Sequence, residues 1–221
     1  MAQTFVIAGT DTNVGKTVFS AALVGALGAR YWKPIQAGIE GGTDSVLVAR
    51  LAGLPPGRIL SSAYELALPA SPHIAARREG IDIRQRMLGL PAVDGPLVVE
   101  TAGGVLVPLS LRLLQVDVMA YWQKPVVLCA RTALGTINHT LLSLEALRRR
   151  RVPVHGVAFI GGPEPEVEGT IVTLGQVRRL GRLAWLDPLD TASLRAAFAD
   201  GFDVRDFAEV EGAPDEQREP G

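Results

Sequence analysis

Short, wholly apolar segments recur along this chain of 221 residues and alternate with longer segments of helical periodicity. Segments rich in Val, Ile and Leu, with no polar alternation, predict strands buried on both faces, which is typical of a parallel sheet between two layers of helices. Their regular alternation with helices predicts a doubly wound, mainly parallel α/β fold. The predicted strands are 4–9, 30–35, 96–101, 125–130, 154–160 and 181–186, and the predicted helices are 16–28, 44–53, 81–90, 111–122, 136–150, 164–175 and 191–199.

The length is ordinary for a single α/β domain, and no internal repeat or interdomain linker is visible. We therefore assign residues 1–208 to one domain. Residues 209–221 carry five acids and one arginine with almost no apolar side chains. Such a composition cannot bury enough apolar surface to fold by itself, and it predicts a disordered acidic tail.

The overall charge argues against two classes of partner. With 22 basic and 23 acidic residues the formal net charge is −1, so binding to nucleic acid or to an anionic membrane through charge is not expected. The N-terminus lacks the basic region of a signal peptide, and no segment approaches the roughly 18 apolar residues of a membrane span. A cytoplasmic protein is predicted. Its one cysteine, Cys129, lies in an apolar segment and is interpreted as a core residue.

The segment GTDTNVGKT, residues 9–17, follows a predicted strand and leads into a predicted helix. This is the place of a phosphate-binding loop, whose backbone N–H groups and helix N-terminus bind phosphate oxygens. In the pattern G-x-x-x-x-G-K-[ST], Lys16 would reach the terminal phosphates and Thr17 would help to hold Mg²⁺. The first glycine is displaced, however, because Gly9 stands one place early and Thr10 occupies its usual position.

Three charged residues are predicted to lie at the same edge of the sheet as this loop. Glu100 closes an apolar strand, where a carboxylate suits a Mg²⁺ site, although a strand-end acid in solvent is the plainer alternative. Asp44 precedes a helix and is equally interpretable as its N-cap. Lys33, one of three lysines with Lys16 and Lys124, ends the second predicted strand.

The chemistry suggested by these residues is phosphoryl transfer through positioning and charge. No nucleophile–base arrangement is visible in the sequence. The three histidines, His73, His139 and His155, lack metal-ligand spacing.

Five segments, taken in order, resemble the successive motifs of the dethiobiotin synthetase family, which belongs to the P-loop NTPase superfamily. They are GTDTNVGKT (9–17), WKPIQAG (32–38), SPHIAARREG (71–80), VVETAGGVLVPLS (98–110) and LGTINHTLLSLEAL (134–147). The resemblance runs from about residue 3 to 160 and weakens afterwards. The family's loop also carries threonine where the strict pattern has its first glycine, so the displaced glycine is a family form of the loop.

The resemblance implies an ATP-dependent ligase of biotin biosynthesis that requires Mg²⁺. Its substrates would be 7,8-diaminopelargonic acid, CO₂ and a nucleoside triphosphate. One amine is carbamylated by CO₂, the carbamate takes the γ-phosphoryl group to form a carbamic–phosphoric anhydride, and the second amine closes the ureido ring. The family also implies a homodimer with the substrate site at the subunit interface.

The matching positions imply roles for individual residues. Lys16 and Lys33 would flank the transferring group, with Thr12 assisting at the carbamate or phosphate oxygens. Thr17, Asp44 and Glu100 would lie at the metal. The nucleotide-binding residues would be Asn13, Val14, Gly15, Lys16, Thr17 and Val18, together with Asp44, Glu100, Thr101, Ala102 and Gly103. Gly135, Thr136, Ile137 and Asn138 open a helix that would bind the substrate carboxylate, although Thr136 is also interpretable as an ordinary helix cap.

Three positions depart from the family pattern. Asn13 stands where the family often has Glu, and Ala37 stands where it supplies a hydroxyl to the substrate. Phe159 is aligned with the family's base-reading asparagine and is predicted to stack on a base at most. Ala184, Trp185 and Leu186 resemble the family's stretch beside the base. Because stacking discriminates poorly between bases, weak base selectivity is expected.

Three other functions were weighed. A P-loop switch ATPase of the partitioning or septum-positioning type usually has a second lysine early in the loop, where this chain has Asp11 and Thr12. An amidation enzyme acting on a cobalamin precursor would need a glutaminase domain, for which the chain is too short. The third alternative is a relative that has lost catalysis. Ala37 and Phe159 favour it, whereas the presence of Lys16, Lys33, Asp44 and Glu100 argues against it.

Overall fold

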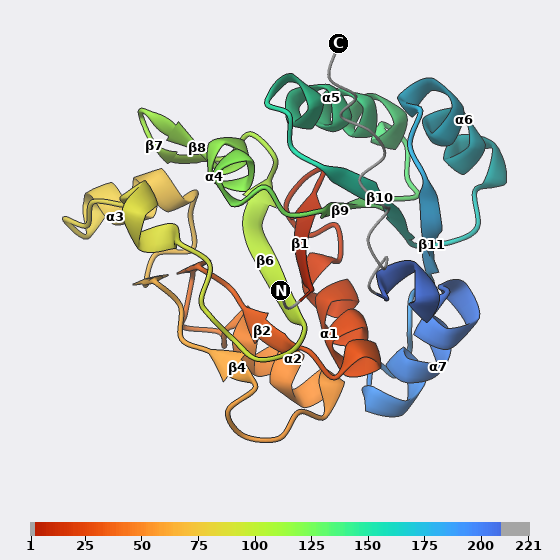
Figure 1. Ribbon diagram of the computed structural model, residues 1–221, viewed down its shortest axis with the longest axis horizontal. Helices are drawn as coiled ribbons and strands as arrows, with labels where there is room; N and C mark the ends of the chain where they lie inside the picture. Colours follow the sequence, from red (N-terminus) through yellow and green to blue (C-terminus); the bar gives the residue numbers. More distant parts are fainter. Residues whose placement is uncertain (1–2, 209–221) are drawn as a thin grey trace, which may run out of the picture.

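The computed structural model describes residues 3–208 and places a twisted parallel sheet at the centre of the molecule (Figure 1). Within these residues the main sheet has seven strands in the order β11-β10-β9-β1-β6-β2-β4, and every pairing in it is parallel. Its strands are β1 (Thr4–Gly9), β2 (Arg30–Trp32), β4 (Ile59–Leu60), β6 (Leu97–Gly104), β9 (Val126–Arg131), β10 (Val154–Ile160) and β11 (Arg179–Leu183). The doubly wound prediction is confirmed.

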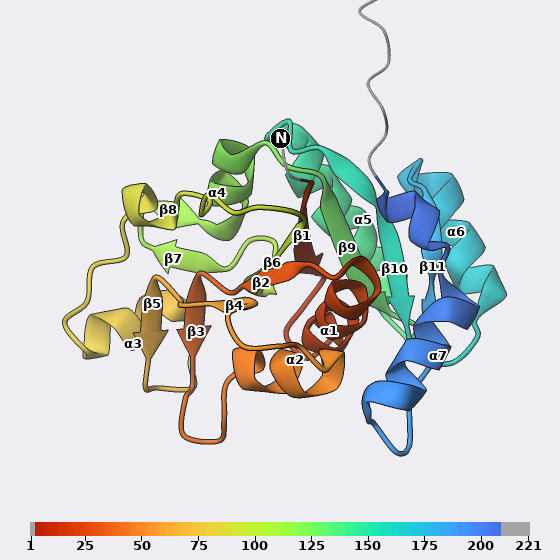
Figure 2. The same cartoon turned by 60° about the horizontal axis from the view of Figure 1, so that its bottom comes forward.

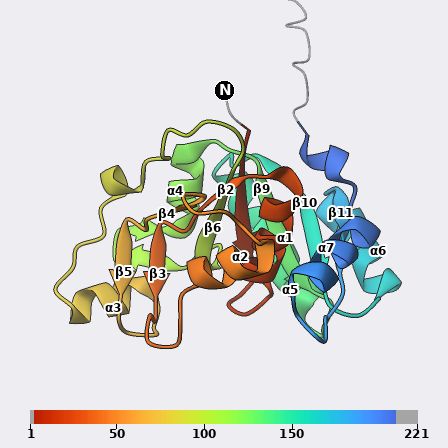
Figure 3. The same ribbon diagram turned by 90° about the horizontal axis from the view of Figure 1, so that it is seen from below.

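Helices cover both faces of this sheet. One face carries α1 (Lys16–Leu27), α2 (Asp44–Ala52) and α7 (Thr191–Gly201), which lie side by side in front of the strands in Figure 3. The opposite face carries α3 (Pro72–Arg78), α4 (Gln115–Trp122), α5 (Thr136–Arg149) and α6 (Pro165–Gly175). The first βα connection therefore sends α1 to one side, and the later crossovers α4, α5 and α6 return on the other.

Successive side chains of β1 divide between two hydrophobic cores. Phe5 and Ile7 join the cluster beneath α1, α2 and α7, whereas Val6 and Ala8 join the cluster beneath α3–α6. The whole strand is buried. This is the arrangement expected from an apolar segment without polar alternation, because both faces of a central parallel strand are covered.

Two predicted strands differ from the observed ones. The segment 30–35 forms two strands, β2 and then β3 (Ile35–Ala37), and β3 pairs with β5 (Tyr64–Leu66) in a separate small sheet near α3 (Figure 2). Pro34 lies between them, and a proline lacks the N–H that a central strand needs to continue its ladder. The predicted strand 181–186 is shifted, because β11 covers Arg179–Leu183.

Two predicted helices also differ. Within 81–90 there is only the 3₁₀ helix η1 (Gln85–Leu88). Ile83 and Leu88 are both buried in one cluster, although five residues separate them by about 140° on an α-helix. The predicted helix 111–122 begins only at Gln115, because the preceding residues form the hairpin of β7 (Pro108–Ser110) and β8 (Leu113–Leu114).

A ring cluster joins the last described residues to the sheet. Phe207, in the 3₁₀ helix η2 (Val204–Phe207), is fully buried. Its ring centroid lies 5.5 Å from that of Phe5, 6.3 Å from that of Phe19 and 6.1 Å from that of Phe198. The predicted acidic tail, 209–221, lies outside the described residues. Within 3–208, no helix is long and apolar enough to cross a membrane.

Replacing Phe207 by alanine is expected to lower the free energy of unfolding by about 3–5 kcal/mol, because the substitution opens a cavity among three other aromatic rings. Urea unfolding followed by tryptophan fluorescence would measure the loss. Val204→Ala is the control, since Val204 lies in the same short helix and is 45% exposed; it should stay within about 0.5 kcal/mol of the parent chain. Equal losses in the two variants would contradict this account.

Candidate functional site

The loop between β1 and α1 explains the displaced glycine of its sequence pattern. A Cβ added to Gly9 would stand 2.8 Å from Val14 Cγ2, 2.9 Å from the Asp11 carbonyl oxygen and 2.9 Å from Lys16 Nζ. The loop folds back over the end of β1 so closely that a side chain at this position has no room. Gly15 has φ +95°, a left-handed conformation that glycine adopts at little cost. Position 10 carries no such restriction, and threonine is accommodated there.

Lys16 lies inside this loop. Its side chain is almost fully buried, and Nζ donates a hydrogen bond to the Asp11 carbonyl oxygen at 3.0 Å. Burial lowers the pKa of Lys16, and the Glu100 carboxylate partly opposes that shift. At the outer side of the loop, Arg131 Nη2 lies 3.4 Å from Asp11 Oδ2. Arg131 ends β9, and the sequence analysis did not single it out.

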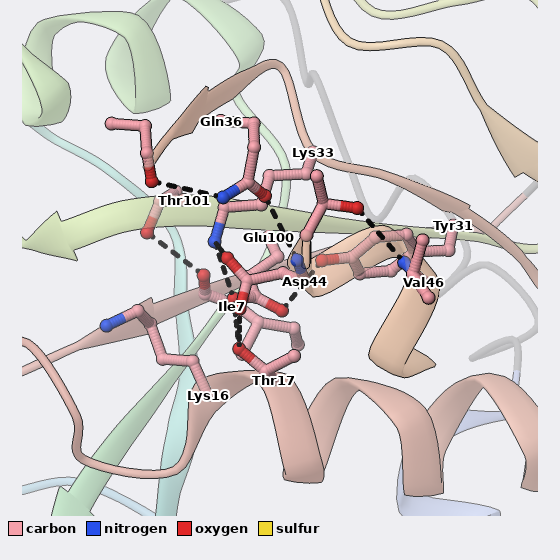
Figure 4. A network of polar contacts seen from close by, with 12 residues as sticks. Ile7, Lys16, Thr17, Tyr31, Lys33, Gln36, Asp44, Val46, Glu100 and Thr101 are labelled. Atoms are coloured by element: carbon pink, nitrogen blue, oxygen red, sulfur yellow. Dashed lines mark hydrogen bonds and ion pairs between the residues drawn. The ribbon is translucent and has the colours of Figure 1, made fainter. Parts of the chain in front are cut away.

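A cluster of two acids, one lysine and one hydroxyl lies beside the start of α1 (Figure 4). Glu100, in β6, has no exposed surface. Lys33 Nζ donates to Glu100 Oε1 at 3.0 Å and also to Asp44 Oδ2. Thr17 Oγ1 lies 2.8 Å from both Asp44 Oδ1 and Glu100 Oε1. Parallel pairing places Lys33 and Glu100 at the same end of the sheet, so the predicted proximity of these residues is confirmed.

Ionisation of the cluster is set by opposing effects. Burial alone would lower the pKa of Lys33, but the Glu100 and Asp44 carboxylates raise the pKa above its ordinary value. Burial alone would raise the pKa of Asp44, and the charge and hydrogen bond of Lys33 outweigh it, so that this pKa is lowered. Lys33 and Asp44 are therefore held in their charged forms, and the Lys33 ammonium donates to both acidic side chains.

The same oxygens form a donor set suited to Mg²⁺. Thr17 has one hydroxyl proton and lies at hydrogen-bond distance from two carboxylate oxygens, so it can donate to only one of them at a time. Two carboxylates and a hydroxyl are hard oxygen ligands, which Mg²⁺ prefers and completes with phosphate oxygens and water. No group of three or more His, Cys, Asp or Glu side chains within 3–208 could hold a metal, so phosphate and water ligands would be required.

Asp44 is not the N-cap of α2. That position belongs to Thr43, whose hydroxyl accepts a hydrogen bond from the Val46 N–H at 3.2 Å. The backbone N–H of Asp44 donates instead to Gln36 Oε1 at 3.1 Å. The side chain of Asp44 is thus free of any capping role and turns to Thr17 and Lys33. The N-cap interpretation of Asp44 is wrong, and Gln36, whose side chain supports Asp44, was not among the predicted site residues.

The predicted phosphate-loop residues differ in what they expose. Thr12 and Asn13 are exposed, whereas Val14 is buried and Val18 packs against the core. Any contact of the two valines with a phosphate would therefore run through their backbone N–H groups. Thr17 points its hydroxyl into the acid cluster, whereas the Lys16 ammonium is directed away from it, to the Asp11 carbonyl within the loop (Figure 4).

The predicted nucleotide-binding residues 100–103 do not form a loop: they lie in β6, beside β1 and the phosphate loop that follows it. Thr101 is fully buried, and its hydroxyl donates to the Ile7 carbonyl at 3.0 Å, so its side chain ties β6 to β1. Ala102 and Gly103 are partly exposed. A Cβ at Gly103, which has φ +63°, would meet Val107 at 2.7 Å and Thr12 Oγ1 at 3.6 Å. Gly103, near the end of β6, thus lies against the phosphate loop at Thr12.

The base-stacking prediction for Phe159 is wrong. Phe159 has no exposed surface and lies in the core beneath α3–α6. Its neighbour Ile160 points to the opposite face of β10, where a Cβ on Gly15 would lie 2.8 Å from Ile160 Cγ2. Because successive side chains of a strand point to opposite faces, the sequence alone already indicated that Phe159 and Ile160 face opposite sides of the sheet. Ile160 is therefore the residue of this strand that faces the phosphate loop.

The predicted segment 184–186 lies beside the end of β10. Ala184 and Trp185 are exposed, Trp185 at 71%, whereas Leu186 packs against the core. A Cβ on Gly161 would stand 3.3 Å from Trp185 Nε1. The exposed indole of Trp185 therefore lies beside the end of β10, whose last residue is Ile160.

The segment 135–138 opens α5, as predicted. Gly135, with φ +90°, is the N-cap, so the interpretation of Thr136 as the cap is wrong. Thr136 is buried, and its Oγ1 has no hydrogen-bond partner within residues 3–208.

A hollow of about 430 Å³ lies between residues 10–12, residues 104–108 and the side of α5 at His139 and Leu142. Ala37 is partly buried in β3.

A larger hollow, of about 820 Å³, lies elsewhere, between α1, α2 and α7. Its lining is rich in alanine, leucine and phenylalanine and includes none of the predicted site residues. Size alone therefore does not locate the charged site of this molecule.

Comparisons with known proteins agree with this geometry. A family model described as an AAA domain matches residues 3–193. Relatives named ATP-dependent dethiobiotin synthetase BioD include one from Rhodopseudomonas palustris (strain BisB18), 58% identical over 94% of this chain and 99% of its own length. Another, from Agrobacterium fabrum, is 59% identical over 95% of this chain and 99% of its own. A third, from Brucella anthropi, is 55% identical over 94% and 98%.

Solved structures with similar folds are more distant in sequence. A ParA family ATPase from Chlorobium tepidum has a TM-score of 0.53 at 10% identity, covering 90% of this chain and 91% of that one. Chloroplast FtsY from Physcomitrella patens has a TM-score of 0.52 at 13% identity, covering 94% of this chain and 64% of that one. At these identities the likeness concerns the fold alone.

The buried charge cluster makes a prediction about stability. Lys33→Met should lower the free energy of unfolding by about 3–5 kcal/mol in EDTA, because it leaves Glu100 charged and buried without its ammonium partner. The double variant Lys33→Met/Glu100→Gln should recover more than half of that loss, since the uncompensated charge is then absent. Urea unfolding of both variants provides the measurement. If the double variant were as unstable as the single one, the charge would not be the cause.

Proposed function

The chain belongs to the dethiobiotin synthetase family, and on that premise we propose that it closes the ureido ring of dethiobiotin from 7,8-diaminopelargonic acid, CO₂ and ATP. The observation that carries this proposal is the convergence of Lys16, Lys33, Thr17, Asp44 and Glu100 at one end of the sheet. The reaction must bring two anions together, a carbamate and a γ-phosphate, and their repulsion must be offset by fixed cations.

Each covalent step has a defined balance. One amine of the substrate adds to CO₂ and loses a proton, giving a carbamate. A carbamate oxygen then forms a bond to the γ-phosphorus while the bond from that phosphorus to the ADP oxygen breaks. The second amine attacks the carbamate carbon of the resulting anhydride, the bond to the phosphate oxygen breaks, and the amine loses its proton as phosphate leaves. The ATP-dependent ring closure is thus a ligase reaction.

Lys16 and Lys33 supply the positive charge for the transfer. Lys16 lies inside the phosphate loop, where it would contact the β- and γ-phosphate oxygens. Lys33 would contact the carbamate and the γ-phosphate from the opposite side, and the raised pKa of its ammonium supports that role. Thr12, exposed beside Gly103, would donate to the same oxygens.

Thr17, Asp44 and Glu100 would hold Mg²⁺ through one hydroxyl and two carboxylate oxygens. When bound, the ion neutralises charge on the phosphate oxygens and aligns the γ-phosphoryl group. Thr17 Oγ1 already lies within hydrogen-bond distance of both carboxylates, so little rearrangement of the backbone is needed to hold a cation there.

The substrate carboxylate would bind at the start of α5 in a homodimer. Thr136 contributes a buried hydroxyl without a partner in the described chain, and the free N–H groups of the first turn suit an anion. Leu134, Leu142 and Leu106 are exposed apolar side chains near this helix end and the hollow beside it. A second copy of the chain would cover them and bring its own Lys33 toward the α5 of the first.

We propose that selectivity for the nucleotide base is weak. The reason is no longer stacking by Phe159, which is buried, but the lack of polar groups at the end of β10. The end of β10 presents Ile160, Gly161 and Gly162, which have no polar side chain. Both backbone groups of Gly161 are paired, its N–H with the Leu183 carbonyl and its carbonyl with Arg182 Nη1. Trp185 offers an exposed ring to any base.

The switch-ATPase alternative has weaker support. The likeness to the ParA family ATPase extends only to the fold. The relatives above 50% identity carry the synthetase name instead.

The direct test is a reaction containing the protein, diaminopelargonic acid, bicarbonate, Mg²⁺ and ATP, with dethiobiotin followed by mass spectrometry. The chain's three lysines provide matched variants. Lys16→Met and Lys33→Met should each lower the rate by about a hundredfold or more, whereas Lys124→Met should remain within about twofold. Absence of product from the parent chain, despite measurable ATP binding, would overturn the proposed function. A preference for ATP above a hundredfold over CTP and GTP would refute weak base selectivity alone.

A second test concerns the metal. Lys33 already bridges the two carboxylates that would bind the cation, so the ammonium and the metal compete for the same charges. Lys33→Met should therefore bind Mn²⁺ more tightly than the parent chain in the absence of nucleotide, by about tenfold, although it is inactive. Electron paramagnetic resonance of free Mn²⁺ would measure this, with Lys124→Met as the control. Weaker binding in Lys33→Met would place the metal elsewhere.

A further inference from the structure

Tyr31 lies behind the charged cluster and contacts it through one atom. Its side chain is fully buried in β2, which pairs with β6 so that Tyr31 stands opposite Val98. The hydroxyl donates to Glu100 Oε2 at 2.9 Å (Figure 4). Burial, together with the adjacent Glu100 carboxylate, raises the pKa of the Tyr31 phenol well above its ordinary value. The group thus remains a donor.

The donors of Glu100 are divided between its two oxygens. Oε1 accepts from Thr17 at 2.8 Å and from Lys33 at 3.0 Å, on the side of the phosphate loop. Oε2 accepts from Tyr31, on the side of the sheet interior. Within residues 3–208, no other hydrogen bond to Oε2 is found. Because Glu100 has no exposed surface, solvent does not supply a replacement.

This division fixes the orientation of the carboxylate. Rotation about the last side-chain bond of a glutamate is soft, so packing alone defines the plane of its carboxylate poorly. A buried carboxylate oxygen without a donor is costly. If the phenol hydroxyl were absent, Oε2 would find donors only by turning toward Thr17 and Lys33, which would displace Oε1.

We propose that Tyr31 is a positioning residue for the metal site: its hydroxyl holds Glu100 with Oε1 directed at Thr17 and thus at the divalent cation. This inference rests on the proposed function, in which Thr17, Asp44 and Glu100 hold that cation. Partners of metal ligands commonly change metal affinity or activity by 10- to 100-fold when they are removed. Within residues 3–208, the Tyr31 hydroxyl forms no hydrogen bond with Lys16 or with the phosphate-loop backbone, so its effect is directed to the metal.

The test uses Tyr31→Phe, which preserves the ring and removes the hydroxyl. Binding of Mn²⁺ to the full chain with a non-hydrolysable ATP analogue is measured by electron paramagnetic resonance. We expect about a tenfold or greater increase in the Mn²⁺ dissociation constant. Affinity for the analogue in EDTA should change by less than about twofold. Raising the Mg²⁺ concentration should restore most of the lost kcat, which a damaged fold would not allow.

Two further variants separate positioning from packing. Tyr64→Phe is the matched control, because the Tyr64 hydroxyl also has hydrogen-bond partners, Asp82 and Arg84, but lies outside the charged cluster. It should leave Mn²⁺ affinity unchanged. In a Glu100→Gln background, Tyr31→Phe should have no additional effect on Mn²⁺ affinity, since Tyr31 acts through that carboxylate.

The outcomes distinguish the inference from its premise. If the parent chain binds Mn²⁺ with the analogue and Tyr31→Phe binds it equally well, the positioning role is refuted and the metal site stands. An additive loss in the Glu100→Gln background would refute it as well. If the parent chain itself fails to bind Mn²⁺ in the presence of the analogue, the proposed metal site fails, and the inference fails with it.

Discussion

A buried carboxylate organises this end of the molecule. Glu100 is fully enclosed in the central sheet, and an enclosed charge is tolerated only when opposite charge and hydrogen-bond donors surround it. Tyr31 in β2 and Lys33 just after it supply two of these groups, and Thr17 at the start of α1 supplies the third. The positions of β2 beside β6 and of α1 beneath them therefore meet one electrostatic requirement, which is to surround the buried Glu100 carboxylate with positive charge and hydrogen-bond donors. The arrangement that satisfies this charge also brings together the groups proposed to bind a triphosphate and a cation.

Much of the fold could be predicted because a buried strand or a glycine-containing loop is recognisable from a few neighbouring residues in the sequence. The strands at 4–9 and 154–160 were predicted with their observed bounds, and the motif at 9–17 spans the connection from β1 to α1 as predicted. The segment 81–90 was not, because Ile83 and Leu88 are buried in a cluster that depends on distant residues rather than on one helical face. A lone sequence carries no signal for such a cluster.

The charged residues of the site could be predicted from the sequence, whereas most of the residues that surround and support them could not. Lys33, Asp44 and Glu100 stand out by residue type at strand and helix ends. Tyr31 does not, because an aromatic side chain within a strand usually belongs to the core, and its hydroxyl matters only once Glu100 is found opposite. The error at Phe159 had another origin. The prediction followed the alignment of Phe159 with the family's base-reading asparagine and neglected the alternation of side chains along the strand. That alternation places Ile160, not Phe159, on the side of the phosphate loop.

The break at Pro34 has a consequence for how such a chain can diversify. The polypeptide leaves the main sheet after Lys33, passes through β3 and a connecting segment, and returns at Asp44, next to the residue it left. The two ends of this excursion are anchored by the charged cluster, whereas its middle, which includes Ala37, is held mainly by the small sheet with β5. Substitutions and insertions in the middle of the excursion are therefore expected to leave the ion pair between its two ends in place. Under the proposed function, such changes would alter contacts with an organic substrate without disturbing the charged groups proposed for phosphoryl transfer.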